Sequence, residues 1–191
     1  MGSILDDPKV RQAIYPMSVA FYHQAGELGL IGEDVELLEG NLVRKMSKSP
    51  VHSWLVQVLL QCLQQSLPSG YCVRKEDPLT FPRSEPEPDL AVVRGSLNEF
   101  RQAHPTTAEL VIEVAVSTVE VDRQKAGIYA AAGVTEYWLL IPDARCIEVY
   151  REPTADGYRQ RRVVSGPVPL ESTALAGFRV ALPELFPEPA V

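Results

Sequence analysis

The stretch from Ser84 to Trp138 constrains the fold of this chain most strongly, because two carboxylates stand inside its apolar runs. The first apolar run begins at Asp89, and the second contains Glu113. An acid inside such a run is costly to bury unless a proton, a metal or a cation compensates it. We therefore expect the fold to bring a compensating group to both acids.

The apolar runs of this stretch predict three strands and one helix. Residues 89–93 form the first strand, and residues 110–115 form a second that is nearly unbroken, as is typical of a sheet centre covered on both faces. A helix is expected over residues 121–132, before Gly133, and a further central strand over residues 136–141. Because side chains on a strand alternate between the two faces, the two acids can converge at one sheet edge if their strands are neighbours.

Upstream, the pattern indicates two helices, a hairpin and a strand. Apolar residues recur at helical spacing over residues 18–28, and Pro50 opens a longer amphipathic helix that ends near residue 67. Two short runs around Gly40-Asn41 predict a hairpin with a two-residue turn. A strand is expected over residues 71–75, followed by a proline-rich extended connection. Short runs downstream predict a β-rich C-terminal extension with strands at residues 146–151, 157–164, 168–170 and 178–182.

These elements predict an α/β protein with one mixed sheet and helices on both faces, rather than a regularly alternating doubly wound fold. A chain of 191 residues is long enough for one domain with a substantial core. We expect an N-terminal arm at residues 1–16 and a single domain over residues 17–191.

Charge and cysteine usage narrow the class of protein. The net charge of −7 argues against a general nucleic-acid coat, but it is compatible with a nuclease that binds a metal and has a local basic groove. The three cysteines are widely spaced among apolar neighbours, which favours reduced buried thiols. The sequence shows neither a signal-peptide pattern nor an apolar run of the ~18 residues that span a membrane. We therefore expect a cytoplasmic protein that does not bind membranes.

Lys125 is the candidate cation for the two acids. It follows Glu113 by 125 − 113 = 12 residues and interrupts the helix stripe expected to pack on the sheet. Two interpretations remain open, because the lysine either extends to solvent past a packed stem or points inward toward the acids. Two carboxylates and a lysine are the parts of a metal-dependent phosphodiesterase: oxygen ligands for Mg²⁺, with Mn²⁺ as a substitute, and a cation for the phosphate. A structural ion pair is the alternative.

The same stretch resembles a known family. The resemblance rests on Pro88-Asp89, Glu113-Val114-Ala115, Asp122, Lys125, Tyr129 and Gly133-Val134-x-Glu136-Tyr137-Trp138. Residues 35–40, 84–89 and 146–150 and the tripeptide Pro50-Val51-His52 fit the same pattern. In this order, the motifs are similar to those of the Uma family of putative restriction endonucleases in the PD-(D/E)xK nuclease superfamily.

The resemblance implies a restriction-endonuclease-like core, Mg²⁺-dependent cleavage of DNA and a possible homodimer. Carried over to this sequence, Asp89 and Glu113 would be metal ligands, with the Val114 carbonyl as a third. The superfamily usually has its lysine two residues after the glutamate, where this chain has Ala115. Lys125 is therefore interpreted as the displaced catalytic lysine. If the Lys125 side chain pointed to solvent, the site would lack this lysine and would be impaired.

Three further residues are accessory candidates for the same site. Glu36 would add an acid, although an exposed hairpin charge explains it equally well. His52 would bind phosphate or relay a proton, although a surface or capping histidine is slightly favoured. Glu76 ends a strand and would bring another acid to the same edge. Structural roles are expected for several other residues: surface positions for His23 and His104, core packing for Tyr137 and Trp138, and a solvated strand face for Arg159, Arg161 and Arg162.

Two functions follow from the sequence. The first is a Mg²⁺-dependent endonuclease that hydrolyses phosphodiester bonds in DNA through Asp89, Glu113 and Lys125. The second is a non-catalytic binding or regulatory module that retains the nuclease fold, in which these three residues form a buried ion-pair network. Ala115 in the usual lysine position and the net charge of −7 motivate the second. Both depend on whether the three side chains converge in one cleft.

Overall fold

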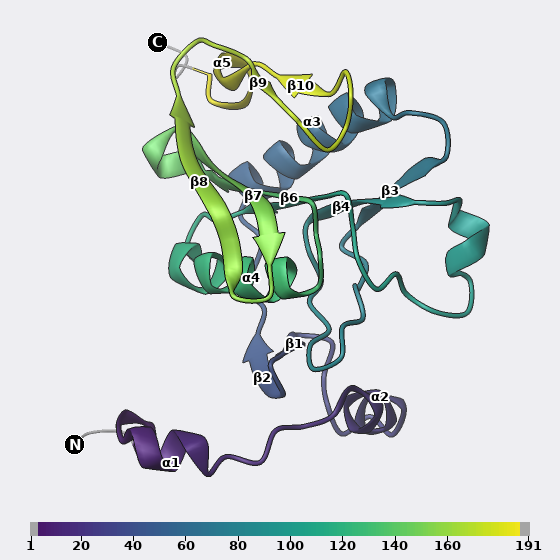
Figure 1. Ribbon diagram of the computed structural model, residues 1–191, viewed down its shortest axis with the longest axis vertical. Coiled ribbons are helices and arrows are strands. Elements are labelled where there is room, and N and C mark those ends of the chain that lie inside the picture. Colours follow the sequence, from purple (N-terminus) through teal and green to yellow (C-terminus); the bar gives the residue numbers. More distant parts are fainter. Residues whose placement is uncertain (1–3, 188–191) are drawn as a thin grey trace.

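A six-stranded mixed sheet forms the centre of the molecule in the computed structural model, which describes residues 4–187 (Figure 1). In order across the sheet, the strands are β3 (Tyr71–Lys75), β4 (Leu90–Arg94), β5 (Leu110–Val114), β6 (Glu136–Ile141), β7 (Cys146–Thr154) and β8 (Gly157–Ser165). Neighbouring strands are antiparallel except β5 and β6, which are parallel. Parallel neighbours need a crossover connection, and the helix α4 (Val119–Ala131) provides it.

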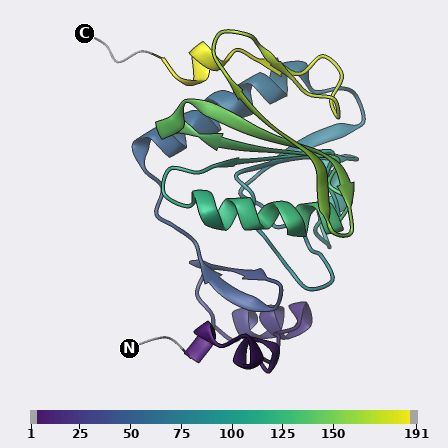
Figure 2. The same cartoon turned by 60° about the vertical axis from the view of Figure 1, so that its left-hand side comes forward.

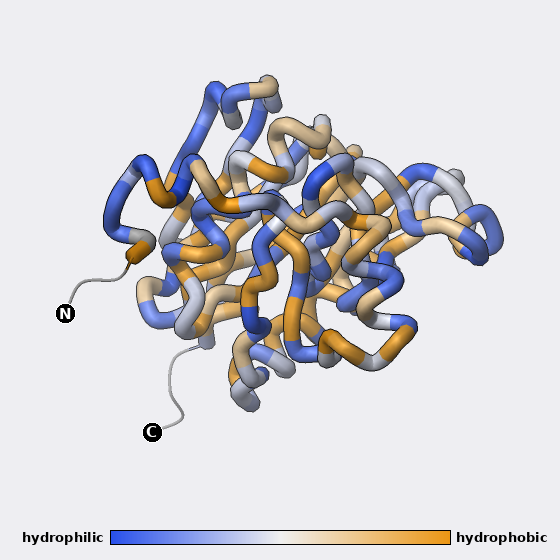
Figure 3. Tube along the Cα trace, turned by 90° about the horizontal axis from the view of Figure 1, so that it is seen from below, coloured by the Kyte–Doolittle hydropathy of each residue, from blue (hydrophilic) through white to orange (hydrophobic). Residues whose placement is uncertain are grey.

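Helices cover both faces of the sheet, as the sequence predicted (Figure 1). The helix α3 (Pro50–Ser66) lies on one face together with the C-terminal elements β9 (Leu170–Glu171), β10 (Arg179–Val180) and α5 (Leu182–Leu185). The helix α4 lies on the other face. Alternate residues of β5 divide between two cores: Ile112 packs with Leu59 of α3, and Val111 packs with Tyr129 of α4. Apolar segments occupy the middle of the molecule in Figure 3.

The N-terminal elements lie at one end of the molecule, below the sheet in Figures 1 and 2. They are η1 (Ile4–Asp6), α1 (Pro8–Gln12), α2 (Val19–Glu27) and the hairpin of β1 (Val35–Leu38) and β2 (Asn41–Arg44). An antiparallel bridge from Leu37 to Glu85 joins the hairpin to the connection between β3 and β4. Residues 1–3 of the expected arm and residues 188–191 of the expected domain lie outside the described part of the chain.

The hairpin turn differs from the prediction by one residue. The turn is Glu39-Gly40, and Asn41 pairs with Leu38 as the first residue of β2. Both turn residues have positive φ, 49° and 80°, as this type of tight turn requires. A Cβ at Gly40 would lie 2.4 Å from the Cβ of Pro16, so glycine is required at this position for space as well as for conformation.

The C-terminal part also differs in detail from the expected extension. Its two long strands, β7 and β8, add to the central sheet. Only residues 179–180 of the predicted strand 178–182 form a strand, β10, and α5 already begins at Leu182. Cys72 and Cys146 are buried and Cys62 is half-buried, all three as free thiols. None of the helices within residues 4–187 has the length and apolar character of a membrane span.

Candidate functional site

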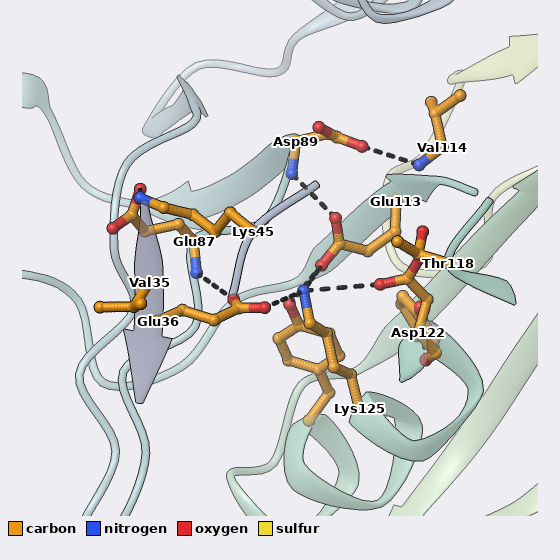
Figure 4. A network of polar contacts seen from close by, with 12 residues as sticks. Val35, Glu36, Lys45, Glu87, Asp89, Glu113, Val114, Thr118, Asp122 and Lys125 are labelled. Atoms are coloured by element: carbon orange, nitrogen blue, oxygen red, sulfur yellow. Dashed lines mark hydrogen bonds and ion pairs between the residues drawn. The ribbon is translucent and has the colours of Figure 1, made fainter. Parts of the chain in front are cut away.

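The structure brings Asp89 and Glu113 together at one edge of the sheet (Figure 4). Asp89 immediately precedes β4, Glu113 lies in the neighbouring strand β5, and both are buried. The Asp89 backbone N–H donates to Glu113 Oε2 at 3.1 Å, and the Val114 N–H donates to Asp89 Oδ2 at 2.8 Å. The two carboxylates therefore hold each other's strands in place as well as sharing a site.

Lys125 points inward from α4 toward these acids and is 6% exposed. Its Nζ lies 2.8 Å from Glu36 Oε1, 3.1 Å from Glu113 Oε1 and 3.5 Å from Asp122 Oδ1 (Figure 4). The solvent-directed interpretation of Lys125 is therefore wrong. Val121, which helical spacing places on the same side as Lys125, is 41% exposed, whereas Ile128 and Ala132 of the expected stripe pack against the core. The buried face consists of Asp122, Lys125, Ala126, Tyr129 and Ala130.

Two residues of this helix face take part in the site although the sequence reasoning gave them no role of their own. Asp122 accepts a hydrogen bond from the Thr118 hydroxyl, and its other oxygen faces Lys125. The Tyr129 hydroxyl donates to Glu113 Oε1 at 2.8 Å. The signal that identifies both is their spacing of three and four residues from Lys125, which places them on its side of the helix.

The hairpin contributes Glu36, which is 4% exposed and therefore not a solvated hairpin charge. Its Oε1 pairs with Lys125, and its Oε2 accepts the Glu87 backbone N–H at 3.2 Å. The β1–β2 hairpin is thus part of the site.

His52 also reaches the site, from the first turn of α3. The Ser49 side chain caps this helix by accepting the His52 backbone N–H at 3.2 Å, which helps to position that turn. The His52 Nε2 lies 3.0 Å from Asp89 Oδ1 and 3.1 Å from Oδ2. Its Nδ1 is buried and has no hydrogen-bond partner within residues 4–187. The favoured interpretation of His52 as a surface or capping histidine is therefore wrong for its side chain.

Glu76 lies in the same cavity, but another residue binds its carboxylate. Lys48 Nζ is 2.6 Å from Glu76 Oε2, and the two lysines Lys48 and Lys75 hold the pKa of Glu76 below its ordinary value against the opposing effect of burial. The Glu76 backbone N–H donates to the Asp89 carbonyl at 3.2 Å. Glu76 therefore neighbours the candidate metal ligands but is engaged in an ion pair at the cavity wall.

These side chains line an open cavity of about 890 Å³. The acids, the lysine and the histidine of the site all contribute to its lining: Glu36, His52, Asp89, Glu113, Asp122 and Lys125. A substrate can therefore approach both carboxylates and the lysine from one side.

Burial and mutual repulsion make two acids of the site, Glu113 and Asp122, hold protons unusually strongly. Burial raises the pKa of Glu113 to about 8; Lys125 opposes this shift, while Asp89, Asp122 and Glu36 add to it. Burial likewise raises the pKa of Asp122, against the opposing effect of Lys125. Burial alone would lower the pKa of Lys125, but the surrounding carboxylates raise it above its ordinary value. The lysine therefore stays charged, and the Glu113 carboxyl gives up its proton less readily than an ordinary glutamate.

The donor atoms at this edge suit a hard divalent cation. Within residues 4–187, no three His, Cys, Asp or Glu side chains are grouped so that they could hold a metal ion by themselves. Mg²⁺ usually keeps several waters and binds through one or two carboxylates, which Asp89 and Glu113 offer. Because the Val114 N–H points to Asp89, and the N–H and C=O of one strand residue face the same neighbour, the Val114 carbonyl is the backbone oxygen on that side. These two carboxylates and one carbonyl fit the requirement.

The mixed sheet with helices on both faces is a nuclease-like fold, as the comparison with a solved structure shows. The chain belongs to the Uma2 family, described as "Putative restriction endonuclease", whose model matches residues 28–183. It is similar to the crystal structure of a putative nuclease belonging to DUF820 from Anabaena variabilis ATCC 29413, with a TM-score of 0.73 and 19% sequence identity. That similarity covers 90% of this chain and 98% of the other. No curated protein matches this sequence.

Proposed function

We propose that this protein is a Mg²⁺-dependent endonuclease that hydrolyses phosphodiester bonds in DNA. One observation carries the proposal: Lys125 enters from α4 and reaches Glu113 at 3.1 Å, beside Asp89, in an open cavity. In this arrangement, Lys125 from α4 would take the role of the lysine that the superfamily usually has at the position of Ala115. Membership of the Uma2 family supports a nuclease in general terms.

Asp89, Glu113 and the Val114 carbonyl would hold the metal ion. A bound Mg²⁺ would polarise the phosphoryl group and supply an activated water. Lys125, held by Glu36 and Asp122, would place a positive charge beside the phosphate, where negative charge develops during hydrolysis.

His52 would orient Asp89, because its Nε2 lies within hydrogen-bonding distance of both carboxylate oxygens. A side chain held in this way loses little freedom when it binds a ligand. Preorganisation of this kind is what an active site needs.

The alternative is a binding or regulatory module without catalysis. The observation in its favour is that Lys125 already has carboxylate partners on three sides, so the network is neutralised in part without a metal. Against it, the Lys125 contacts lie on Glu113 Oε1, whereas Asp89 is linked to Oε2. Lys125 therefore donates to the Glu113 oxygen that does not accept the Asp89 backbone N–H.

Cleavage of supercoiled plasmid in Mg²⁺ or Mn²⁺ tests the proposal. We expect nicking and linearisation by the unaltered protein, loss of both in Asp89→Ala, and full activity in the control Asp143→Asn, which changes an exposed acid on η3 (Pro142–Ala144). Activity that survives Asp89→Ala would contradict the proposed site. Absence of both cleavage and metal binding in the unaltered protein, measured by calorimetry, would favour the binding module.

A further inference from the structure

A basic segment borders the acidic site. Residues 44–49, with the sequence Arg-Lys-Met-Ser-Lys-Ser, connect β2 to α3, and all six line the cavity that contains Asp89 and Glu113. Three of the first five residues of this segment are cations: Arg44, Lys45 and Lys48. In a chain with a net charge of −7, this is a local concentration of positive charge beside the candidate site.

Each of the three cations is held by an acid that lines the same cavity. Lys48 Nζ lies 2.6 Å from Glu76, Lys45 Nζ lies 2.8 Å from Glu87, and Arg44 Nε lies 3.6 Å from Asp34. The Arg44 side chain is 82% exposed and that of Lys48 is 48% exposed. Exposed pairs of this kind contribute little to stability because water and salt screen them, so an incoming anion can replace the acid at little cost. This separates the segment from Lys125, which is buried among its carboxylates.

The spacing of the cations fits a repeating anion better than a single one. Arg44 is the last residue of β2, residues 45–49 follow it outside any strand or helix, and the four steps from Arg44 to Lys48 span at most about 14 Å. Arg44 and Lys48 pair with different acids, Asp34 and Glu76, and a sugar–phosphate backbone, which carries one charge at every nucleotide, can offer each of them its own phosphate.

We propose that residues 44–49 bind the sugar–phosphate backbone of the nucleic acid on one side of the cleavage site. Arg44 and Lys48 exchange their acid partners for phosphates. Lys45 can do the same nearer to the acids of the site, because its partner Glu87 donates its backbone N–H to Glu36. The assignment rests on the proposed function in one respect, namely that a nucleic acid enters this cavity. It adds a surface that positions the substrate in a chain whose net charge is −7.

In the proposed arrangement, the acids that pair with these cations weaken DNA binding. Glu76 competes with phosphate for Lys48 and adds repulsion at the cavity wall. Replacing Glu76 by glutamine keeps the side-chain volume but frees the lysine, so DNA affinity should rise. This opposite sign distinguishes a phosphate-binding segment from one that merely supports the fold.

The experiment measures binding of a short fluorescein-labelled DNA duplex by anisotropy in EDTA, so that affinity is read without cleavage. The test variant is Arg44→Gln/Lys48→Gln. The matched control is Arg159→Gln/Arg162→Gln, which removes the same charge from exposed positions on β8. We expect the test variant to bind about 10-fold more weakly and the slope of log Kd against log salt to fall by about 2, one for each lost phosphate contact. The control should stay within about 2-fold, and Glu76→Gln should bind more tightly.

Equal weakening in both double variants would show that only net charge matters, and would overturn the assignment. Unchanged affinity in the test variant, or weaker binding in Glu76→Gln, would overturn it as well. The Asp89→Ala protein separates this result from the proposed function, because it should bind the duplex while failing to cut it. If the protein binds DNA through residues 44–49 but never cleaves it, the proposed nuclease activity is contradicted while the proposed binding segment is supported.

Discussion

Two glutamates on neighbouring central strands, Glu113 on β5 and Glu136 on β6, are both buried but have opposite surroundings. Glu136 is 0% exposed and is surrounded by donors. Its Oε1 receives the Trp138 indole N–H at 2.9 Å and the Arg151 guanidinium at 2.8 and 2.7 Å. Its Oε2 receives donors from a later loop: the Ser172 and Thr173 hydroxyls and the backbone N–H groups of Thr173 and Ala174.

Glu113 has fewer donors and several acidic neighbours. It accepts from the Asp89 backbone, Lys125 and Tyr129, while Glu36 and Asp122 pair with the same lysine. Burial raises the pKa of Glu113 to about 8. Burial would also raise the pKa of Glu136, but its hydrogen bonds, led by Ser172 and Trp138, lower it below the ordinary value.

The difference separates a structural carboxylate from one that is suited to a reaction. Glu136 has all its donors in the folded chain, so it can gain nothing from a ligand. Glu113 borders a cavity with its charge incompletely compensated, and a divalent cation would relieve the repulsion among the acids. The comparison predicts that the two residues fail in different ways when they are changed.

The largest expected effect is on cleavage. Glu113→Gln keeps the volume of the side chain but removes the charge that would bind the metal, so cleavage should fall by about 10²–10³-fold, the range typical of one preorganised catalytic group. Plasmid nicking rates measure this, and calorimetry should show weaker Mg²⁺ binding. Full activity and unchanged metal affinity in Glu113→Gln would remove this residue from the site.

The next largest effect is the loss of stability expected when Glu136 is replaced. Glu136→Gln leaves Arg151 without its buried acid and cannot satisfy the same set of donors, so the free energy of unfolding should fall by about 3–5 kcal/mol. Urea denaturation followed by circular dichroism measures the change. Glu113→Gln is the matched control on the adjacent strand and should lose much less. Equal losses in the two variants would show that the comparison has no functional meaning.

The two glutamates should also differ in how their contribution to the free energy of unfolding depends on pH. The folded pKa of Glu113 is raised to about 8 from an ordinary 4.5, so the folded metal-free protein binds a proton that the unfolded chain has lost. This contribution to stability is complete below about pH 4.5 and is lost as the pH rises through about 8, at up to ~1.4 kcal/mol per pH unit. Glu136 has the opposite sign: its contribution is present above pH 4.5 and is lost as acid protonates it. Denaturation between pH 5 and 8 should therefore show a falling stability that Glu113→Gln flattens and Glu136→Gln does not.

The strands and the two principal acids could be predicted from the sequence because both depend on local patterns. An apolar run defines a strand, and an acid inside it stands out. The direction of Lys125 could not be settled, since the buried face of a helix depends on how the helix docks. The same holds for His52: the Ser49-Pro50 helix start is visible in the sequence, but its position against Asp89 is set by tertiary packing.

Distant contacts explain the remaining differences between prediction and structure. Glu36 reaches Lys125 only because the hairpin is attached to the β3–β4 connection, and nothing local in the sequence indicates that attachment. The donors to Glu136 Oε2 lie 36 to 38 residues downstream, in a loop with no pattern of its own. The sequence therefore identified Asp89 and Glu113 as acids inside apolar strands, but only the structure shows that Glu136 is another buried acid, with a full set of donors that Glu113 lacks.

The smallest expected effect concerns Tyr129, the neutral donor to Glu113. Tyr129→Phe removes the hydroxyl that donates to Glu113 Oε1 at 2.8 Å while keeping the buried ring, so the free energy of unfolding should fall by about 0.5–1.5 kcal/mol near neutral pH. Tyr137→Phe is the matched control on the same core face, because its hydroxyl donates to the Asp122 backbone carbonyl and not to a site carboxylate. Both variants should lose similar stability, but only Tyr129→Phe should alter the pH range over which Glu113 titrates, measured as the same stability profile between pH 5 and 8. An identical shift in the two variants would mean that the hydroxyl of Tyr129 stabilises the core without tuning the acid that distinguishes this site.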